Sequence, residues 1–121
     1  MPDTQKNLYK KLLGKRGEIA AANYLKKSGY KIIERNYRAK CGEADIIALS
    51  DDTIIFIEVK TRSSCKFGLP CEAVNWHKQK RYIDIAKEYV FKNKLENINI
   101  RFDIIEVLKG KVNHIINAFQ C

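Results

Sequence analysis

The 121-residue chain contains little proline and glycine, with 2 and 6 residues respectively. No apolar run exceeds four residues, whereas a transmembrane helix needs about 20. The first eleven residues, MPDTQKNLYKK, lack the apolar segment of a secretory signal peptide. These absences exclude a collagen-like repeat, a low-complexity linker and a transmembrane helix, and they predict a cytoplasmic protein with no membrane partner.

Cysteine is present, but the pattern typical of a metal site is absent. The four cysteines, at positions 41, 65, 71 and 121, form no CxxC pair, and the two histidines do not have zinc-finger spacing. In a cytoplasmic protein we expect free thiols. A metal site at Cys65 and Cys71 is the less favoured alternative.

The remaining composition is that of one globular domain, residues 1–121. Hydrophobic residues make up 45% of the chain and charged residues 31%, which is too apolar for a disordered tail. A chain of this length buries roughly two-thirds of its unfolded surface on folding. We therefore expect one hydrophobic core.

Positive charge is concentrated in the first third of the chain. The formal net charge is +9, and residues 1–40 hold eleven Lys and Arg against three Asp and Glu, whereas residues 41–121 hold twelve against eleven. A basic face attracts phosphate backbones without reading sequence, although a solvated helix face has the same composition. A membrane surface is disfavoured because the first helix lacks an apolar face rich in Trp, Phe and Leu.

Hydrophobic periodicity predicts the element order α-β-β-β-α-β-β. The expected elements are a helix over residues 7–28 capped by Gly29, strands over 30–36, 42–50 and 53–61, a loop over 62–74, a helix from Asn75 to about Lys92, and strands over 99–108 and 111–116. The first three strands can form an antiparallel meander, and the second helix returns the fourth strand parallel to the third. The predicted fold class is α/β, with a mixed central sheet flanked by two helices.

Four polar side chains meet at one end of the two central strands. If Asp51-Asp52 is a two-residue turn, residues whose numbers sum to 103 are paired, so Asp45 faces Glu58 and Glu43 faces Lys60. Alternation places all four side chains on one face. Directly opposed like charges destabilise a sheet. A divalent cation such as Mg²⁺, which commonly binds one or two carboxylates, removes that repulsion.

The first helix adds a third acid to this group. Glu18 lies on or beside the face that packs on the sheet, because it shares helical spacing with Leu25. Gly14 and Gly17 are poor helix formers and allow a close approach of the backbone there. Each acid alone is most simply an ion-pair partner. Together with Lys60, however, the acids favour a metal site.

Such a site is suited to hydrolysis of a phosphodiester. A metal held by Asp45 and Glu58 polarises a phosphoryl oxygen and lowers the pKa of bound water. Lys60 orients or deprotonates the attacking water, or neutralises charge in the transition state.

The spacing of these residues resembles a known nuclease motif. Asp45, twelve intervening residues and then Glu58-Val59-Lys60 resemble the D…ExK motif of the PD-(D/E)XK, restriction-endonuclease-like nucleases, and the element order is similar to their α-β-β-β-α-β core. Glu18, preceded by Gly17, resembles the helical acid of archaeal Holliday junction resolvases. An ordered set of segments also resembles the YraN family of small bacterial proteins, usually described as predicted endonucleases: GE at 17–18, GEAD at 42–45, FIEVKTR at 56–62, FG at 67–68, EAV at 72–74, KQK at 78–80 and RFD at 101–103.

The resemblance implies a role for each of several residues. Asp45, Glu58, Glu18 and the Val59 carbonyl would be ligands of Mg²⁺ or Mn²⁺, and Lys60 would be the catalytic lysine. Glu43 is an accessory residue of the motif. Gln79, at the start of the second helix, either orients a phosphate or the attacking water, or is an ordinary polar residue of a helix start. Contacts with the nucleic-acid backbone would come from Lys11, Lys15, Arg16, Arg38, Lys40, Arg62, Lys78 and Lys80.

The expected function is therefore metal-dependent hydrolysis of phosphodiester bonds in nucleic acid, with DNA, including branched DNA, as the favoured substrate. The alternatives are a catalytically silent nucleic-acid-binding module with the same fold, and an adaptor domain whose acids are ion pairs. A homodimer is also considered, because junction specificity normally requires two copies. Asp103 is expected to pair with Arg101, and His77 and His114 are expected at the surface.

Overall fold

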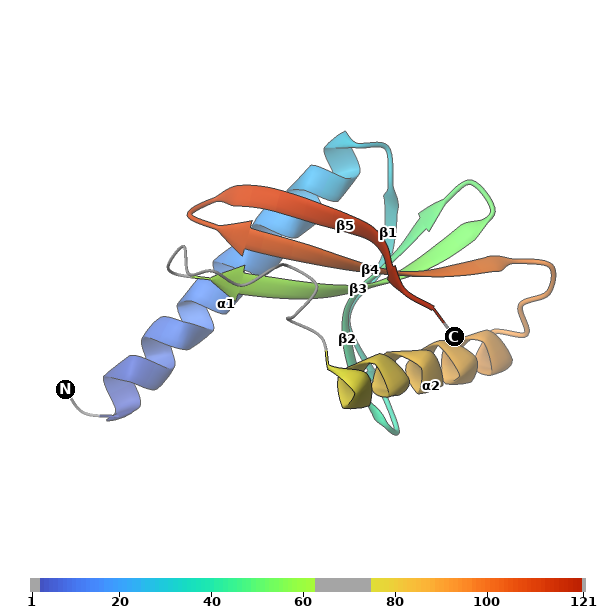
Figure 1. Cartoon of the computed structure of the whole chain (residues 1–121), viewed down its shortest axis with the longest axis horizontal. Helices are drawn as coiled ribbons and strands as arrows, with labels where there is room; N and C mark the ends of the chain where they lie inside the picture. Colours follow the sequence, from blue (N-terminus) through green and yellow to red (C-terminus); the bar gives the residue numbers. More distant parts are fainter. Residues whose placement is uncertain (1–2, 63–74, 121) are drawn as a thin grey trace.

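The computed structural model describes residues 3–62 and 75–120, and its elements confirm the predicted order. Figure 1 shows α1 (Asp3–Lys27), β1 (Lys31–Ala39), β2 (Gly42–Ser50), β3 (Thr53–Arg62), α2 (Trp76–Lys92), β4 (Asn99–Leu108) and β5 (Lys111–Phe119). The helix predicted from residue 7 begins at Asp3. Residues 63–74 of the predicted loop, with two cysteines and two of the motif segments, lie outside the described residues, as does Cys121.

The five strands form one mixed sheet in the order β1-β2-β3-β4-β5. The pairs β1–β2, β2–β3 and β4–β5 are antiparallel, whereas β3 and β4 are parallel because α2 carries the chain across between them. The predicted register, in which paired numbers sum to 103, is confirmed from Ser50–Thr53 to Ile46–Ile57. The expected fold class is thus confirmed.

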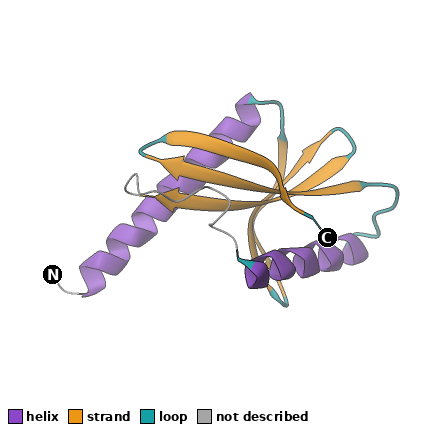
Figure 2. Ribbon diagram, viewed as in Figure 1, coloured by secondary structure: helices purple, strands orange, loops and turns teal. Residues whose placement is uncertain are grey.

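Each face of the sheet is covered by one helix. In Figures 1 and 2, α1 crosses one face obliquely and its first turns project beyond the sheet, while α2 covers the other face. Side chains of β3 alternate between the two layers: Phe56 packs in a cluster with Tyr82 of α2, whereas Ile55 and Ile57 pack in a cluster with Leu25 of α1. We call these the α2-side cluster and the α1-side cluster.

Two strands are longer than predicted. β1 continues through Asn36 to Ala39, and β5 continues through Asn117 to Phe119. The prediction ended both strands at or just before these asparagines, which adopt positive φ values of 52° and 55°. Phe119 then stacks on Phe102 with ring centroids 4.9 Å apart, so the additional residues complete the α2-side cluster.

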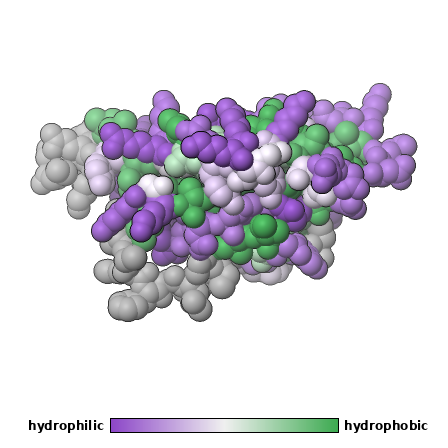
Figure 3. All heavy atoms as spheres, turned by 90° about the horizontal axis from the view of Figure 1, so that it is seen from above, coloured by the Kyte–Doolittle hydropathy of each residue, from purple (hydrophilic) through white to green (hydrophobic). Residues whose placement is uncertain are grey.

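On the face drawn in Figure 3, hydrophobic residues form separate patches among hydrophilic ones. Within residues 3–62 and 75–120, no helix combines the length and the apolar character needed to cross a membrane. Cys41 is an exposed free thiol, as expected.

Asp103 is fully buried and organises a polar network beneath α1. Arg101 donates two hydrogen bonds to it, from Nε to Oδ1 at 2.9 Å and from Nη2 to Oδ2 at 2.8 Å, which confirms the predicted pair. The N–H of Asn117 donates to Oδ1 at 2.9 Å. His114 was expected at the surface, and this prediction is wrong. Its side chain is 4% exposed, with Nε2 2.7 Å from Asp103 Oδ2 and Nδ1 2.9 Å from the Tyr24 hydroxyl, because α1 covers this part of β5.

We predict that Asp103→Asn lowers the free energy of unfolding at pH 7 by about 2–3 kcal/mol, because the Arg101 guanidinium loses its buried counter-ion. Burial alone raises the pKa of Asp103, but hydrogen bonds from His114, Arg101 and the Asn117 N–H outweigh it and hold the pKa below the ordinary 3.8. This stabilisation is present above about pH 4 and is lost as the pH falls through the folded-state pKa. Urea unfolding at pH 7 and pH 3 provides the test. If the free energies of unfolding of wild type and Asp103→Asn differ as much at pH 3 as at pH 7, the ionised Asp103 carboxylate is not the source of the stabilisation.

Candidate metal and nucleic-acid site

The two central strands separate at the residues that form the site. Their pairing ends at Ile46 and Ile57. Beyond that point the N–H of Val59 donates to Asp45 Oδ2 at 2.8 Å, and the N–H of Asp45 donates to the Tyr82 hydroxyl at 3.3 Å. Side-chain groups therefore take over from the main-chain ladder.

β2 also changes the face that it presents at Asp45. Ala44 packs in the α2-side cluster, whereas Ile46 packs in the α1-side cluster. Residues two apart on a regular strand share a face, so the strand is twisted out of alternation here. Glu58 contacts α2, while Asp45 lines a cleft against α1. The prediction that both acids lie on one face is therefore wrong, although their carboxylates remain close enough to interact.

The cleft between α1 and the ends of β2 and β3 collects most of the predicted site residues. Its volume is about 630 Å³, and its lining includes Glu18, Glu43, Asp45, Val59 and Lys60, together with Lys10 and Asn36, which the sequence pattern did not single out. Three acids and two lysines thus line one hollow surface. The fourth acid, Glu58, lies behind it on the α2 side.

Gly17 allows α1 to approach the sheet beside this cleft. The residue is buried, and a Cβ at this position would overlap the side chain of Thr61. The predicted close approach is therefore present at Gly17. At Gly14 a Cβ would meet no atom within 4 Å, so the expectation does not hold there.

Burial and neighbouring acids make the Asp45 carboxyl difficult to ionise. Burial raises its pKa most, and repulsion from Glu58 and Glu18 adds to the rise, so that the pKa reaches about 7. The pKa of Glu18 is also raised, first by burial and then by Glu43 and Glu58, against the opposing effect of Arg35. The acids of the site therefore interact electrostatically with one another.

α2 holds both oxygens of Glu58. The Tyr82 hydroxyl donates to Oε2 at 2.6 Å, and Lys78 Nζ forms an ion pair with Oε1. Gln79 lies in the first turn of the same helix, where its N–H donates to the Asn75 carbonyl at 3.0 Å. Asn75 caps the helix as predicted by accepting from the Lys78 N–H, also at 3.0 Å. The contacts of Tyr82 and Lys78 with Glu58 were not predicted.

The donor set suits a hard divalent cation. In the part of the chain that the structure describes, no three His, Cys, Asp or Glu side chains form a group that could hold a metal ion. Mg²⁺, however, commonly uses only one or two carboxylates, with water and phosphate oxygens completing its shell. Asp45 and Glu58 are two interacting carboxylates, and the Lys78 ammonium already occupies a cation position on Glu58. These residues therefore fit the predicted ion as a two-carboxylate site.

The predicted nucleic-acid contacts differ in how available they are. Five of the basic residues are exposed: Lys11, Lys15, Arg16, Lys40 and Lys80. Arg38 is also exposed, with Nε 3.7 Å from Glu43 Oε2. Arg62 is 24% exposed and its Nε lies 2.7 Å from Glu106 Oε2, while Lys78 is paired with Glu58. Six of the eight predicted contacts are thus exposed, and three of these six lie on α1.

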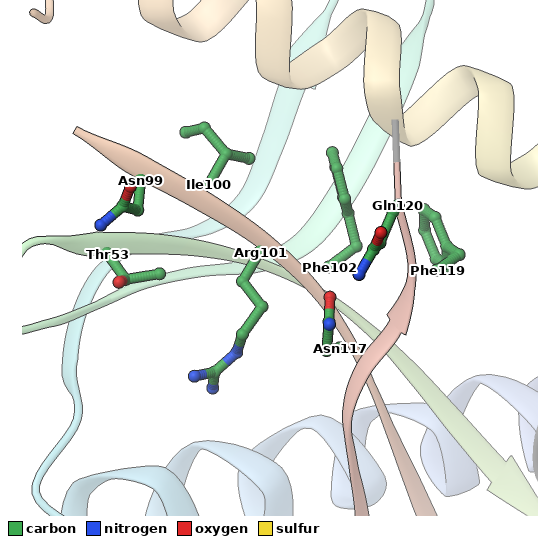
Figure 4. Close-up of a pocket in the computed structure, with 8 residues that line it drawn as sticks. All are labelled: Thr53, Asn99, Ile100, Arg101, Phe102, Asn117, Phe119 and Gln120. Atoms are coloured by element: carbon green, nitrogen blue, oxygen red, sulfur yellow. The ribbon is translucent and has the colours of Figure 1, made fainter. Parts of the chain in front are cut away.

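A second pocket, of about 540 Å³, lies at the start of β3 and β4 (Figure 4). No carboxylate or lysine lines it. Figure 4 shows Arg101 turned away from α2 and toward α1, on which side it bonds to Asp103. This pocket offers no carboxylate to a divalent cation, so the cleft beside α1 is the candidate site.

Comparison with known proteins identifies the family. The model of the uncharacterised protein family UPF0102 matches residues 17–107. The chain belongs to the UPF0102 family. A UPF0102 protein of Clostridioides difficile is 56% identical over 105 residues, which cover 85% of this chain and 92% of that protein. Similar proteins of Caldanaerobacter subterraneus and Persephonella marina are 50% and 41% identical, over 94% and 88% of this chain and 99% and 92% of theirs. The resemblance to the YraN family is therefore confirmed, because that family is UPF0102.

We predict that Asp45→Asn raises the free energy of unfolding at pH 8 by about 1–3 kcal/mol, because it removes a charge that burial and Glu58 oppose. A carboxyl whose folded pKa is about 7 costs stability as the pH rises from its unfolded value near 4, and costs none below that value. Guanidinium unfolding should therefore show a gain at pH 8 that disappears at pH 4. The matched control is Glu96→Gln, an exposed acid outside the cleft. An equal gain in stability at both pH values would show that the negative charge of Asp45 is not what destabilises the wild-type protein.

Proposed function

We propose that this protein is a metal-dependent nuclease of the restriction-endonuclease-like superfamily, which hydrolyses phosphodiester bonds in DNA. The observation that carries the proposal is the cleft where Glu18, Asp45 and Lys60 meet beside the separated strands, with the Glu58 carboxylate close enough to repel that of Asp45. Acids that oppose one another's ionisation destabilise an ordinary sheet. Titratable groups with perturbed pKa values in a cleft are typical of an active site.

Each residue of the site would have its own part in the chemistry. Asp45, Glu58 and the Val59 carbonyl would hold Mg²⁺ or Mn²⁺, and Glu18 would do so directly or through water. Such an ion, when bound, polarises a phosphoryl oxygen and acidifies water. Lys60 lines the same cleft, where its ammonium can orient the attacking water or neutralise charge on the phosphoryl group in the transition state. Glu43 and Gln79 have accessory roles in this scheme.

The cleft opens beside the basic face of α1. Lys10 lines it, and Lys11, Lys15 and Arg16 are exposed on the same helix. Such a face attracts phosphate backbones at long range and binds them without sequence preference. A nucleic-acid strand attracted by α1 would therefore pass close to the acids.

A second candidate is a catalytically silent nucleic-acid-binding module. Two observations favour it: both oxygens of Glu58 are already engaged by Tyr82 and Lys78, and the described residues contain no three-acid metal group. In such a protein α1 would still bind nucleic acid. The two candidates therefore differ in turnover and in metal binding.

A cleavage panel over single-stranded, duplex, flap and four-way DNA, with Mg²⁺, Mn²⁺ or chelator, tests the proposal. Wild type is expected to cleave at least one substrate only with metal, and Glu58→Gln is expected to abolish that cleavage. Lys60→Ala should lower turnover by about 10²–10⁴-fold while DNA binding persists. Lys87→Ala, an exposed lysine of α2, is the control. Binding without cleavage by wild type throughout the panel would favour the silent module, and unchanged cleavage by Glu58→Gln would exclude the assigned ligand.

DNA binding is expected to weaken steeply with salt. The logarithm of the binding constant should fall linearly with the logarithm of the salt concentration, with a slope of about −0.9 for each phosphate contact. Lys15→Ala, which removes one exposed charge from α1, should make the slope less negative by about one such contact. Fluorescence anisotropy with labelled DNA in chelator measures both quantities. A response that is independent of salt would rule out α1 as the docking surface.

A further inference from the structure

Two side chains one turn apart on α2 contact the same carboxylate. The Tyr82 hydroxyl donates to Glu58 Oε2 at 2.6 Å, and the Lys78 ammonium is paired with Oε1. Positions i and i+4 lie on one face of a helix. α2 therefore presents a neutral donor and a cation to Glu58 together. The sequence predicted only a nucleic-acid contact for Lys78, and the proposed nuclease mechanism gives no role to Tyr82.

The two contacts differ in how firmly they are held. Tyr82 is 1% exposed and packs within the α2-side cluster. Its hydroxyl also accepts from the N–H of Asp45 at 3.3 Å and lies 3.4 Å from the Ile57 carbonyl, so it joins β2 to β3 where their ladder ends. The side chain of Lys78 is 32% exposed. A lysine with a partly solvated, flexible stem can move its ammonium into water, whereas the packed tyrosine cannot move.

The charges at the site indicate what each contact does. The Tyr82 hydroxyl contacts both the Asp45 N–H and Glu58 Oε2, so the two acids lie close together, and their negative charges repel each other. A cation next to Glu58 reduces that repulsion, and in this structure the cation is the Lys78 ammonium. A divalent ion on the same carboxylate would supply more positive charge and would be repelled by the lysine. The Tyr82 hydroxyl carries no charge, so it can stay on Glu58 when an ion is bound.

We propose that Tyr82 is a positioning residue of the cation site and that Lys78 competes with the cation for Glu58. Tyr82 fixes the Glu58 carboxylate beside Asp45 both with and without the ion. Lys78 neutralises Glu58 until a divalent ion displaces it, after which its ammonium is free to contact a phosphate. This inference rests on the proposed function for the nature of the site. It adds that occupation of the site requires an internal ion pair to break.

Binding of Mn²⁺ to the full chain without nucleic acid, measured by loss of the free-ion signal in electron paramagnetic resonance, tests this inference. Tyr82→Phe should weaken binding by about 10–100-fold, as is typical when a group that orients a ligand is lost. Lys78→Gln should tighten binding by about tenfold, and Lys78→Arg, which keeps the competing charge, should remain close to wild type. Tyr89→Phe and Lys87→Gln remove the same groups from other positions on α2 and should leave the affinity unchanged.

Tyr82→Phe is expected to weaken Mn²⁺ binding and Lys78→Gln to tighten it. If the two residues only stabilised the fold, neither substitution would tighten binding. Lys78→Gln that binds Mn²⁺ as wild type does, or more weakly, would overturn the competition. Tyr82→Phe that folds and binds normally would overturn the positioning role. If thermal melting shows that Tyr82→Phe does not fold, Tyr82→Met replaces it, because methionine also lacks the hydroxyl and adapts to irregular packing. Wild type that binds no Mn²⁺ would overturn the proposed function as well, whereas normal wild-type binding with unaffected variants would overturn this inference alone.

Discussion

The hydrogen-bond ladder between β2 and β3 ends at Ile46 and Ile57, and the candidate site depends on this separation. A sheet that opens in its interior exposes main-chain donors, which are costly when buried without partners. Here the Asp45 carboxylate accepts from the Val59 N–H and the Tyr82 hydroxyl accepts from the Asp45 N–H. The strands can therefore separate while these two donors stay satisfied. The separated strands line the resulting cleft with two acids, Glu43 and Asp45, and one lysine, Lys60.

The two helices contribute to this opening from opposite faces. α1 comes close to the sheet at Gly17, which brings Glu18 and a series of exposed basic residues to the cleft. α2 brings Tyr82 and Lys78 to Glu58 from the other side. Acids from β2, β3 and α1 thus interact although they lie in different layers. No single element forms the site.

Asp103, which is fully buried, and Asp45, which is half-buried, show how their surroundings determine what a carboxylate does. Asp103 is surrounded by donors from Arg101, His114 and Asn117, so its pKa is lowered and its charge stabilises the fold. Asp45 has one main-chain donor and two nearby acids, so its pKa is raised and its charge is unfavourable. Natural proteins commonly sacrifice stability in this way at functional positions. The contrast supports a functional role for Asp45 and a structural role for Asp103.

Local pattern and simple counting were enough to predict much of the fold from the sequence. The element order, the helix cap at Asn75, the turn at Asp51-Asp52 and the register from Ser50 to Ile46 all depend on residue types and spacing. The change of face at Asp45 could not be predicted, because alternation assumes that a ladder continues. The contact of the buried Tyr82 with Glu58 could not be predicted either, because spacing does not reveal where a hydroxyl points.

His114 was missed for a related reason. An isolated histidine on an edge strand normally lies at the surface, and only the position of α1 over β5 explains its burial against Asp103. The contact of Lys78 with Glu58 likewise joins residues from a helix and a strand that no local pattern relates. Such contacts depend on how the layers pack, whereas the cluster of acids could be predicted because strand pairing is nearly regular up to Asp45.

Anomalous scattering from crystals grown with Mn²⁺ would show directly whether the separated strands hold a divalent cation. We expect one strong anomalous peak in contact with Asp45 and Glu58, with the Lys78 ammonium withdrawn from Glu58. Ordered carboxylates without a peak between them, or a peak bound only elsewhere on the molecule, would exclude a cation site between these strands.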